Sequence, residues 1–294
     1  MVETIINDIN YRLNEETLTA EVIKKENGYN GDIIIPETVV FNERTYRVTS
    51  IGEGAFYQCE SLKSIIIPDS VTSIGKRAFE NCNSLTSITI PDSVTSIGGY
   101  AYWCSALASI AIPDSITSIG NRAFSECFDL KSIIIGNGVT SIGKKTFWNC
   151  KSLTNIVVAK GNTVYDSREN CNAIIETATN KLICGCQHTV IPDNVMSIES
   201  CAFEGCESLK DIAIPNSVKS IGEAAFYKCE SLKSVIIGNG VTSIGMWAFC
   251  ECESLTTITF QGTIAQWKKI ELSNGWNDEF PSEVVHCTDG DVEI

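Results

Sequence analysis

The segment from Ile67 to Ile90 reads IPDSVTSIGKRAFENCNSLTSITI, and near copies of it fill most of the 294-residue chain. The Ser-Ile pair within this segment sets the phase, because its isoleucine returns at Ile51, Ile74, Ile97, Ile119, Ile142, Ile198, Ile221 and Ile244. Most of these steps are 23 residues, one is 22, and one gap of 56 residues interrupts the series. A fixed period of about 20–29 residues, with apolar side chains at fixed phases, is typical of a stacked solenoid.

Each repeat begins with a short strand. Leu62, Ile65 and Ile67 have the spacing of a strand whose alternate residues face inward, and Pro68 ends its ladder pairing. Matching strands are predicted at Ile33–Ile35, Ser64–Ile67, Ser87–Ile90, Ser109–Ile112, Ser132–Ile135, Asn155–Val158, Asp211–Ile214, Ser234–Ile237 and Thr257–Phe260.

Two further segments complete the coil. Val71–Ile74 is predicted to be extended, and Gly75 allows a sharp change of direction. Lys76–Cys82 has the pattern of one or two helical turns, with Ala78 and Phe79 directed at the core. Since a coil buries its apolar side chains only under a neighbouring coil, the chain is predicted to be an α/β solenoid.

The Leu-x-x-Ile-x-Ile strand pattern, followed by Ile-Gly-x-x-Ala-Phe-x-x-Cys, resembles the BspA-like family of leucine-rich repeats, which is found widely in bacterial surface proteins and in some protists. Eight units carry the motif over roughly Ser50–Phe260, apart from an insertion. The resemblance implies a right-handed superhelix with short strands on its concave face and short helical turns on its convex face. It also implies a surface-exposed binding protein, because family members are described mostly as adhesins or as uncharacterised.

The chain before the repeats predicts a β-rich N-terminal cap over residues 1–49, because a terminal coil would otherwise expose an apolar face. One hairpin is expected to join Tyr11–Leu13 to Thr19–Ile23, and a second to join Val39–Phe41 to Thr45–Val48.

The repeat region is assigned to residues 50–260. Within its long gap, an irregular β-hairpin unit at 158–189 is expected to pair Ala173–Glu176 with Lys181–Ile183. Residues 261–294 predict a C-terminal cap with a short amphipathic helix and loop and a final strand. We expect cap, repeats and cap to form one continuous structural domain.

Composition excludes several classes of protein. Hydrophobic residues make up 44% of the chain, which is enough for a core and argues against disorder. A net charge of −14 repels nucleic acid, and no apolar run is long enough to span a membrane. The N-terminal residues lack the pattern of a secretory signal, so the protein is expected either to be cytoplasmic or to have lost a signal.

Eight of the fourteen cysteines share one repeat phase: Cys59, Cys82, Cys104, Cys127, Cys150, Cys206, Cys229 and Cys252. We interpret them as a ladder of free cysteines that act as small, buried, weak hydrogen-bond donors, which favours a reducing setting. Disulfides are the alternative, since stacked neighbours would lie about 5 Å apart.

No catalytic, metal or cofactor site is predicted. Cys184, Cys186 and His188 lack the fourth ligand of a structural zinc site, so strand packing is the favoured interpretation. His286 and Cys287 are adjacent in a strand and point to opposite faces, which prevents a Cys-His dyad.

A second column follows the prolines, with Asp69, Asp92, Asp114 and Asp193 in some repeats and asparagine in others. Because asparagine is equivalent there, turn formation explains the column better than calcium does.

The strand residues that alternate with the inward ones are expected to face the concave side and to form the candidate binding surface: Ser64, Ile66, Ser87, Thr89, Ser109, Ala111, Ser132, Ile134, Asn155, Val157, Asp211, Ala213, Ser234, Ile236, Thr257 and Thr259. Solenoids usually bind through such faces, and a row of Ile, Val and Thr can form an apolar interaction patch. An inert surface is the alternative, because the face lacks aromatic and arginine anchors.

We therefore predict a non-catalytic, adhesin-like module that binds a host or matrix protein at the bacterial surface or after secretion, with a cytosolic scaffold as the alternative.

Overall fold

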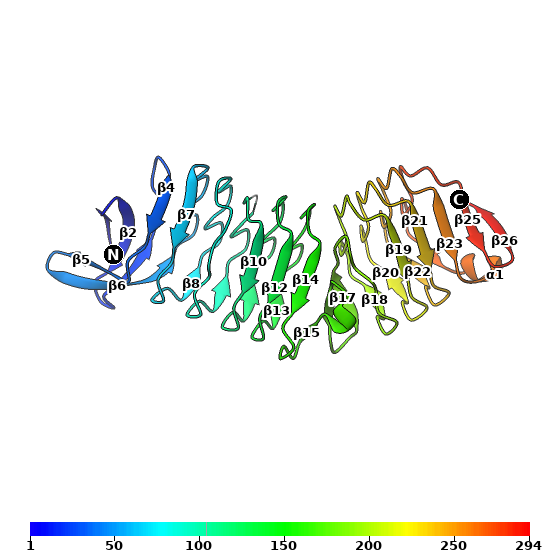
Figure 1. The fold of residues 1–294 in the computed structure, drawn as a ribbon, viewed down its shortest axis with the longest axis horizontal. Helices are drawn as coiled ribbons and strands as arrows, with labels where there is room; N and C mark the ends of the chain where they lie inside the picture. Colours follow the sequence, from blue (N-terminus) through cyan, green and yellow to red (C-terminus); the bar gives the residue numbers. More distant parts are fainter. Residues whose placement is uncertain (104) are drawn as a thin grey trace. The chain divides into compact units, whose positions relative to one another are not determined.

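The Ser-Ile pair of each repeat forms a two-residue strand that pairs in parallel with the Ser-Ile pair of the next coil. The computed structural model describes residues 1–103 and 105–294 (Figure 1). These residues form two compact units, Met1–Cys150 and Lys151–Ile294. Within each unit the coils are stacked as the repeat predicts, and the solenoid is confirmed. The division into caps and repeats stays a prediction.

The short strands build one sheet in each unit. In the first unit they are β6 (Arg44–Ile51), β8 (Ser73–Ile74), β9 (Ser96–Ile97), β11 (Ser118–Ile119) and β13 (Ser141–Ile142). In the second they are β17 (Lys181–Cys184), β18 (Ser197–Ile198), β20 (Ser220–Ile221), β22 (Ser243–Ile244) and β24 (Glu271–Leu272). Between neighbouring repeats serine lies opposite serine, as in Ser73 opposite Ser96 and Ser197 opposite Ser220. At the ends of the second unit's stack, Lys181 lies opposite Ser197 and Glu271 lies opposite Ser243.

The longer strands form the second face of the coils. In the first unit β4 (Gly31–Ile34) pairs with β7 (Leu62–Ile66), and β10 (Ser109–Ile112) pairs with β12 (Ser132–Ile135). The second unit contains β14 (Asn155–Val158) and the sheet β19 (Asp211–Ile214), β21 (Ser234–Ile237), β23 (Thr257–Phe260), β25 (Val284–Cys287) and β26 (Gly290–Glu293).

The strand predicted at Ser87–Ile90 is absent, and that prediction is wrong. Pairing begins where the Ala108 N–H donates to the Thr86 carbonyl at 3.1 Å, but no ladder continues from there. Ile88 is consequently half-buried, whereas Ile65 and Ile110 at the same phase are buried. Coils therefore stay paired at the short strands while their long-strand side separates.

The third face of the coil consists of consecutive turns, and the predicted helical turns and α/β class are wrong. In the coil after Gly75, the backbone φ angles of Arg77 and Asn81 are 57° and 60°, which no α-helix accommodates. The same two phases have positive φ in other coils, as at Arg122 (54°) and Glu126 (56°). The chain has only one short α-helix, α1 (Ile264–Trp267), and one 3₁₀ turn, η1 (Arg168–Asn170), within the described residues.

Alternating backbone conformation on this turn face directs backbone groups toward the next coil. The N–H groups of Gly54, Phe56 and Gln58 donate to the carbonyls of Lys76, Ala78 and Glu80 at 2.8–2.9 Å. An α-helix would instead use these donors within its own coil. The turn face is thus a third ladder between coils, alongside the two sheets.

A column of aromatic rings fills the core behind the turn face. Phe56, Phe79, Tyr102, Phe124 and Phe147 stack in the first unit with centroids 5.0–5.6 Å apart. In the second unit Phe203, Phe226 and Phe249 stack at 4.8 and 5.0 Å. All of these phenylalanines are buried, and all except Phe147, which follows Thr146, belong to the Ala-Phe motif of the repeat.

The predicted hairpins form at the first unit's N-terminal end. β1 (Val2–Ile6), β2 (Ile9–Asn14) and β3 (Thr19–Val22) are antiparallel neighbours, and β5 (Thr38–Phe41) pairs with β6.

The hairpin predicted within the long gap also forms, in the second unit. β15 (Tyr165–Asp166), β16 (Ile174–Glu176) and β17 are antiparallel, and β17 then continues the stack of short strands. Among the described residues, no helix is long and apolar enough to cross a membrane.

Candidate functional site

An outer row of uncharged side chains follows one phase of the long-strand face. We define it as Ile34, Ile66, Thr89, Ala111 and Ile134 in the first unit, and as Val157, Val190, Ala213, Ile236 and Thr259 in the second. Ile66 is 58% exposed and Ile236 is 38% exposed, although both lie in strands whose neighbouring residues are buried. Pairing brings members together, as Ile34 lies opposite Ile66 and Ala213 lies opposite Ile236.

None of the sixteen residues predicted for the binding surface is buried. Ser132, Ser234 and Thr259 are half-buried, and the remaining thirteen are exposed. Polar members make local contacts across the strands: the Ser64 hydroxyl donates to Asp32 at 2.6 Å, and the Ser234 hydroxyl donates to Asp211 at 2.7 Å. Their role in binding stays a prediction.

Two members of the outer row were missed by the sequence reasoning. Ile34 is 66% exposed and Val190 is 73% exposed. Ile34 lies in the predicted N-terminal cap and Val190 just after the predicted irregular unit, so neither was included in the surface. The signal was present in both places, because each residue stands two positions before a proline, as Ile66 stands before Pro68.

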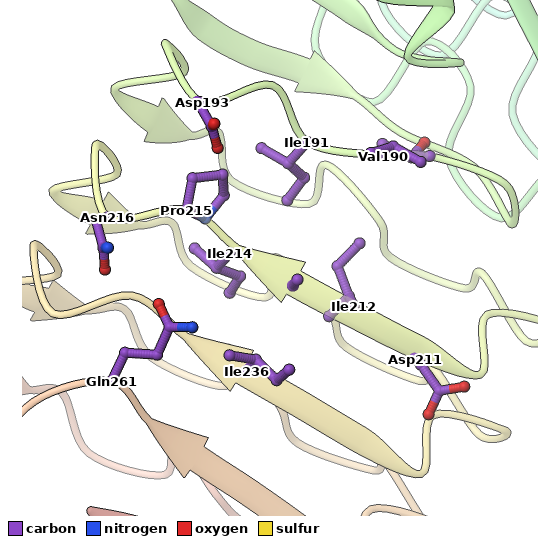
Figure 2. Close-up of a pocket in the computed structure, with 12 residues that line it drawn as sticks. Val190, Ile191, Asp193, Asp211, Ile212, Ile214, Pro215, Asn216, Ile236 and Gln261 are labelled. Atoms are coloured by element: carbon purple, nitrogen blue, oxygen red, sulfur yellow. The ribbon is translucent and has the colours of Figure 1, made fainter. Parts of the chain in front are cut away.

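A groove opens on the long-strand face of the second unit (Figure 2). It has a volume of about 460 Å³ and is lined by Thr189, Val190, Ile191, Asp193, Asp211, Ile212, Ala213, Ile214, Pro215, Asn216, Ile236 and Gln261. Residues 189–191 occupy the strand phase of the preceding coil, yet they form no strand. The short strands β17 and β18 remain paired on the other face, so this groove repeats the separation seen at Ser87–Ile90.

Next to this groove, β19 is the edge strand of its sheet. The Ile214 carbonyl accepts the Gly238 N–H at 2.8 Å and the Lys210 carbonyl accepts the Lys233 N–H at 2.7 Å, so the even-numbered residues direct their backbone toward β21. Alternate residues of a strand point their N–H and C=O groups to opposite sides. The backbone groups of Asp211 and Ala213 therefore face the groove, and they have no backbone partner among the described residues.

The cysteine ladder is built from thiols that bond to the preceding coil. Cys82 donates to the Phe56 carbonyl, Cys127 to the Tyr102 carbonyl and Cys229 to the Phe203 carbonyl, at 3.1–3.2 Å. Cys59, Cys82, Cys127, Cys206, Cys229 and Cys252 of the ladder are free thiols, and Cys104 lies outside the described residues. Burial raises the pKa of Cys127 to about 11 and raises the pKa of Cys82 and Cys229 further, which makes these thiols weak nucleophiles.

The residues considered for a metal site or a Cys-His dyad make local packing contacts instead. Within residues 1–103 and 105–294, no group of three or more His, Cys, Asp or Glu side chains could hold a metal ion. Cys186 is buried, and its thiol donates to the Asn172 carbonyl, while His188 is exposed. His286 lies 2.9 Å from Asp291 and is exposed, whereas Cys287 is half-buried.

The side chains of the aspartate column bond to the next coil, whereas turn formation within their own coil was expected. The Asp114 carboxylate accepts the backbone N–H of Asn137 at 2.7 Å, and the Asn216 side chain accepts the backbone N–H of Asn239 at 2.8 Å. Charge is therefore not required at this phase.

A row of cationic and aromatic side chains on the turn face of the first unit was also missed. The guanidinium of Arg122 lies 6.0 Å from the Tyr100 ring and 5.1 Å from the Trp148 ring, and Arg77 lies 5.6 Å from Tyr100. Arg77, Tyr100 and Arg122 share one of the positive-φ phases. This row was not predicted because the segment was expected to be helical, and helical geometry would not align these side chains from one coil to the next.

Comparison with known proteins identifies the repeat. The model of the BspA type leucine rich repeat region matches residues 49–174 and 174–274 in six copies. A solved structure of a leucine rich cell surface protein from Faecalibacterium prausnitzii is 25% identical, with a TM-score of 0.56, covering 94% of this chain and 99% of that one.

Two more distant structures share the fold. A leucine-rich repeat protein from Bacteroides ovatus is 24% identical with a TM-score of 0.61, covering 95% of this chain and 71% of that one. The pneumococcal vaccine antigen PcpA is 18% identical with a TM-score of 0.52, covering 96% and 98%. The comparison with curated proteins finds no match.

Proposed function

The chain belongs to the BspA-type leucine-rich repeat family, and from this we propose that it is a non-catalytic protein-interaction module whose outer row contacts a partner protein. The partner is a host or matrix protein, and the module acts at a bacterial cell surface or after secretion. The similar protein from Faecalibacterium prausnitzii, which is described as a cell surface protein, supports this location.

The outer row is the observation that carries the proposal. Ile34, Ile66 and Ile134 keep large aliphatic side chains 46–66% exposed in a chain with a net charge of −14. Solvent-facing strand positions usually hold polar residues, and contiguous exposed apolar surface marks interaction sites. An inert face would have no physical reason to keep β-branched apolar residues at this phase in both units.

The absence of catalysis is supported by the chemistry of the conspicuous side chains. The thiols of Cys82 and Cys127 donate to backbone carbonyls, and burial raises the pKa of both. His286 contacts Asp291, but its neighbour Cys287 is half-buried on a strand where adjacent side chains alternate. The contacts of these cysteines and of His286 are explained by packing within the fold and do not require a catalytic role.

Three glutamates on the outer row provide the test. The variant Ile66→Glu/Ile134→Glu/Ile236→Glu is expected to bind at least tenfold more weakly to whichever protein the wild type retains from a panel of immobilised extracellular-matrix proteins. Each glutamate would have to be desolvated against the partner.

The matched control is Val40→Glu/Met196→Glu/Met246→Glu, which adds the same charge at exposed apolar residues outside the outer row. It is expected to bind as the wild type does. Equal loss in both variants, or undiminished binding of the outer-row variant with an unchanged circular dichroism spectrum, would refute the proposal.

A cytosolic scaffold is the second candidate, and the free cysteines favour it. Cys82, Cys127 and Cys229 of the cysteine ladder are free thiols, and free thiols persist best in a reducing compartment. Mass measurement of the protein isolated from its native cells under thiol-blocking conditions separates the two candidates. Intermolecular or intramolecular disulfides in that material would count against the scaffold.

A further inference from the structure

The groove of the second unit has the features of a vacant strand position. On one wall, the backbone groups of Asp211 and Ala213 point into it from β19, without backbone partners among the described residues. On the other wall, the Val190 N–H donates away from the groove to the Cys171 carbonyl at 3.1 Å. By alternation, the Thr189 carbonyl and the Ile191 N–H face β19, while the Thr189 N–H donates to the Cys186 carbonyl of its own coil at 3.1 Å.

This arrangement leaves hydrogen-bonding groups on both walls. Neither the Thr189 carbonyl nor the Ile191 N–H has a backbone partner in the described part of the chain. In a regular coil these groups would pair with the next strand, as β19 pairs with β21 along four residues. Unpaired strand edges are templates for an added strand.

The residues that line the groove indicate which side chains an added strand would have. Val190, Ile191, Ile236 and Pro215 give it an apolar surface, which suits an inward-facing Val, Ile or Leu. Its only charged residues are Asp193 and Asp211, and no Lys or Arg lines it. A basic side chain on the added strand would therefore meet complementary charge at the rim.

We propose that the groove binds an extended segment of the partner protein by strand addition to β19, with an apolar side chain in the groove and a flanking Lys or Arg beside Asp193 or Asp211. This inference rests on the proposed function, since it assigns the partner a peptide segment. A volume of about 460 Å³ falls within the usual range of ligand sites. A four-residue strand spans about 13 Å, comparable to the length of β19.

The probe for this inference is a fluorescein-labelled, end-capped peptide of alternating Thr and Val with one Lys at each end. Wild-type protein is expected to bind it saturably by fluorescence anisotropy. A peptide of the same sequence with N-methyl groups on alternate residues lacks the donors of a ladder and is expected to bind at least about fivefold more weakly per lost pair of bonds. A version with Glu in place of Lys is expected to bind more weakly still at low salt.

Two variants separate backbone pairing from charge. Ala213→Pro removes one groove-facing N–H without touching the bonds to β21, and is expected to weaken the Lys peptide at least about fivefold. Asp193→Asn/Asp211→Asn is expected to remove the preference for Lys over Glu peptides.

Thr38→Pro is the control for the proline. Thr38 lies in the edge strand β5, outside the outer row and the groove, and its N–H faces away from β6 because the Glu37 carbonyl accepts the Val48 N–H. It is expected to leave peptide binding unchanged.

Hydrogen exchange reports on the site independently of affinity. The Asp211 and Ala213 amides are expected to exchange much faster than those of Ile212 and Ile214 in the free protein, and to become protected when the Lys peptide is added. Protection without peptide, equal binding of the N-methylated peptide, or unchanged binding by Ala213→Pro would overturn strand addition.

Failure of this inference is distinguishable from failure of the proposed function. If matrix-protein binding depends on the outer row while no peptide binds the groove, strand addition alone is refuted. If the outer-row variant keeps matrix-protein binding, the proposed function is refuted whatever the peptide does.

Discussion

Residues with positive φ occur at two fixed phases of the turn face, and most of them are not glycine. One phase contains Arg77 and Ala224 but also Gly54, and the other contains Asn81 but also Gly205. Left-handed backbone costs a non-glycine residue about 1 kcal/mol. The cost is offset here because such a residue directs its own N–H to the next coil: Arg77 donates to the Gly99 carbonyl at 3.0 Å, and Ala224 donates to the Met246 carbonyl at 2.8 Å.

Replacing Ala224, whose φ is 51°, with glycine tests this account. Relief of the left-handed strain opposes the added flexibility of the unfolded chain, so we expect a free energy of unfolding between unchanged and about 1 kcal/mol higher. The control is Ala225→Gly, at a buried position without positive φ, which is expected to lose about 1 kcal/mol. Urea denaturation measures both, and equal destabilisation would contradict the account.

The buried thiols predict a loss of stability at alkaline pH. Burial raises the pKa of Cys127 from 9.0 to about 11, so the folded state holds this proton more tightly than the unfolded state does. The contribution is complete below about pH 9 and is lost between pH 9 and 11, at about 1.4 kcal/mol per pH unit.

The variant Cys127→Ser keeps a donor near the Tyr102 carbonyl but does not titrate in this range. Its free energy of unfolding is expected to fall less steeply than the wild type's between pH 9 and 11. Parallel pH profiles for the two proteins would show that Cys127 does not contribute.

Among the elements, the aromatic column of the first unit contains one irregular member. Tyr102 stacks between Phe79 and Phe124 at 5.2 and 5.0 Å, and its hydroxyl is buried without a hydrogen-bond partner in the described chain. A buried, unpaired hydroxyl costs about 1–3 kcal/mol. It is the only tyrosine among the five stacked rings.

Tyr102→Phe is therefore expected to raise the free energy of unfolding by about 1–2 kcal/mol, because it removes that hydroxyl and keeps the stacked ring. The opposite substitution, Phe124→Tyr, buries a new hydroxyl and is expected to destabilise by a similar amount. Thermal denaturation of the pair checks the prediction, and a less stable Tyr102→Phe would mean that the hydroxyl has a partner after all.

The elements also show which parts of the fold could be predicted from the sequence. Period-2 apolar patterns predicted strands such as Ser109–Ile112 correctly, since inward and outward residues alternate whatever the neighbouring coil does. The helical turns over Lys76–Cys82 were wrong, because Ala-Phe followed by Cys has similar spacing in a helix and in successive turns. Gly54 and Gly205, at the positive-φ phases, were the signal that distinguishes the two.

Ser87–Ile90 and the groove could not be predicted, because their cause is not local. Both sequences have ordinary strand patterns, and the long-strand side opens only through the way one coil meets the next. The outer row was largely predictable from alternation, whereas Ile34 and Val190 were missed because the surface was limited to recognisable repeats. The repeat pattern does not identify the protein that binds to the outer row.

At the scale of the whole molecule, acidic residues greatly outnumber basic ones. The chain has 36 acidic and 22 basic residues, and its ion pairs, such as Arg12–Glu3 and Lys181–Glu199, are substantially exposed. Exposed ion pairs contribute about 0–1 kcal/mol each to the free energy of unfolding. Salt therefore stabilises the protein more by weakening repulsion among the excess carboxylates than it destabilises the protein by weakening these pairs.

We therefore expect the midpoint of thermal unfolding to rise by a few degrees when NaCl is increased from about 10 to 150 mM, as the screening length shortens to about 8 Å. Potassium chloride is the control for a specific effect of sodium and should act equally. A midpoint that falls with either salt would indicate that attractive pairs dominate.

The uniform register between coils has a genetic consequence. Ser96 lies opposite Ser118 and Ser118 opposite Ser141, so each of these coils presents to the next coil the same short-strand edge to which it is itself paired. Recombination between two repeats in the same reading frame would add or remove a whole coil and leave the remaining contacts as they were. Length is accordingly the property of this protein that mutation can alter most easily without loss of folding, and related strains are expected to differ in it by whole repeats.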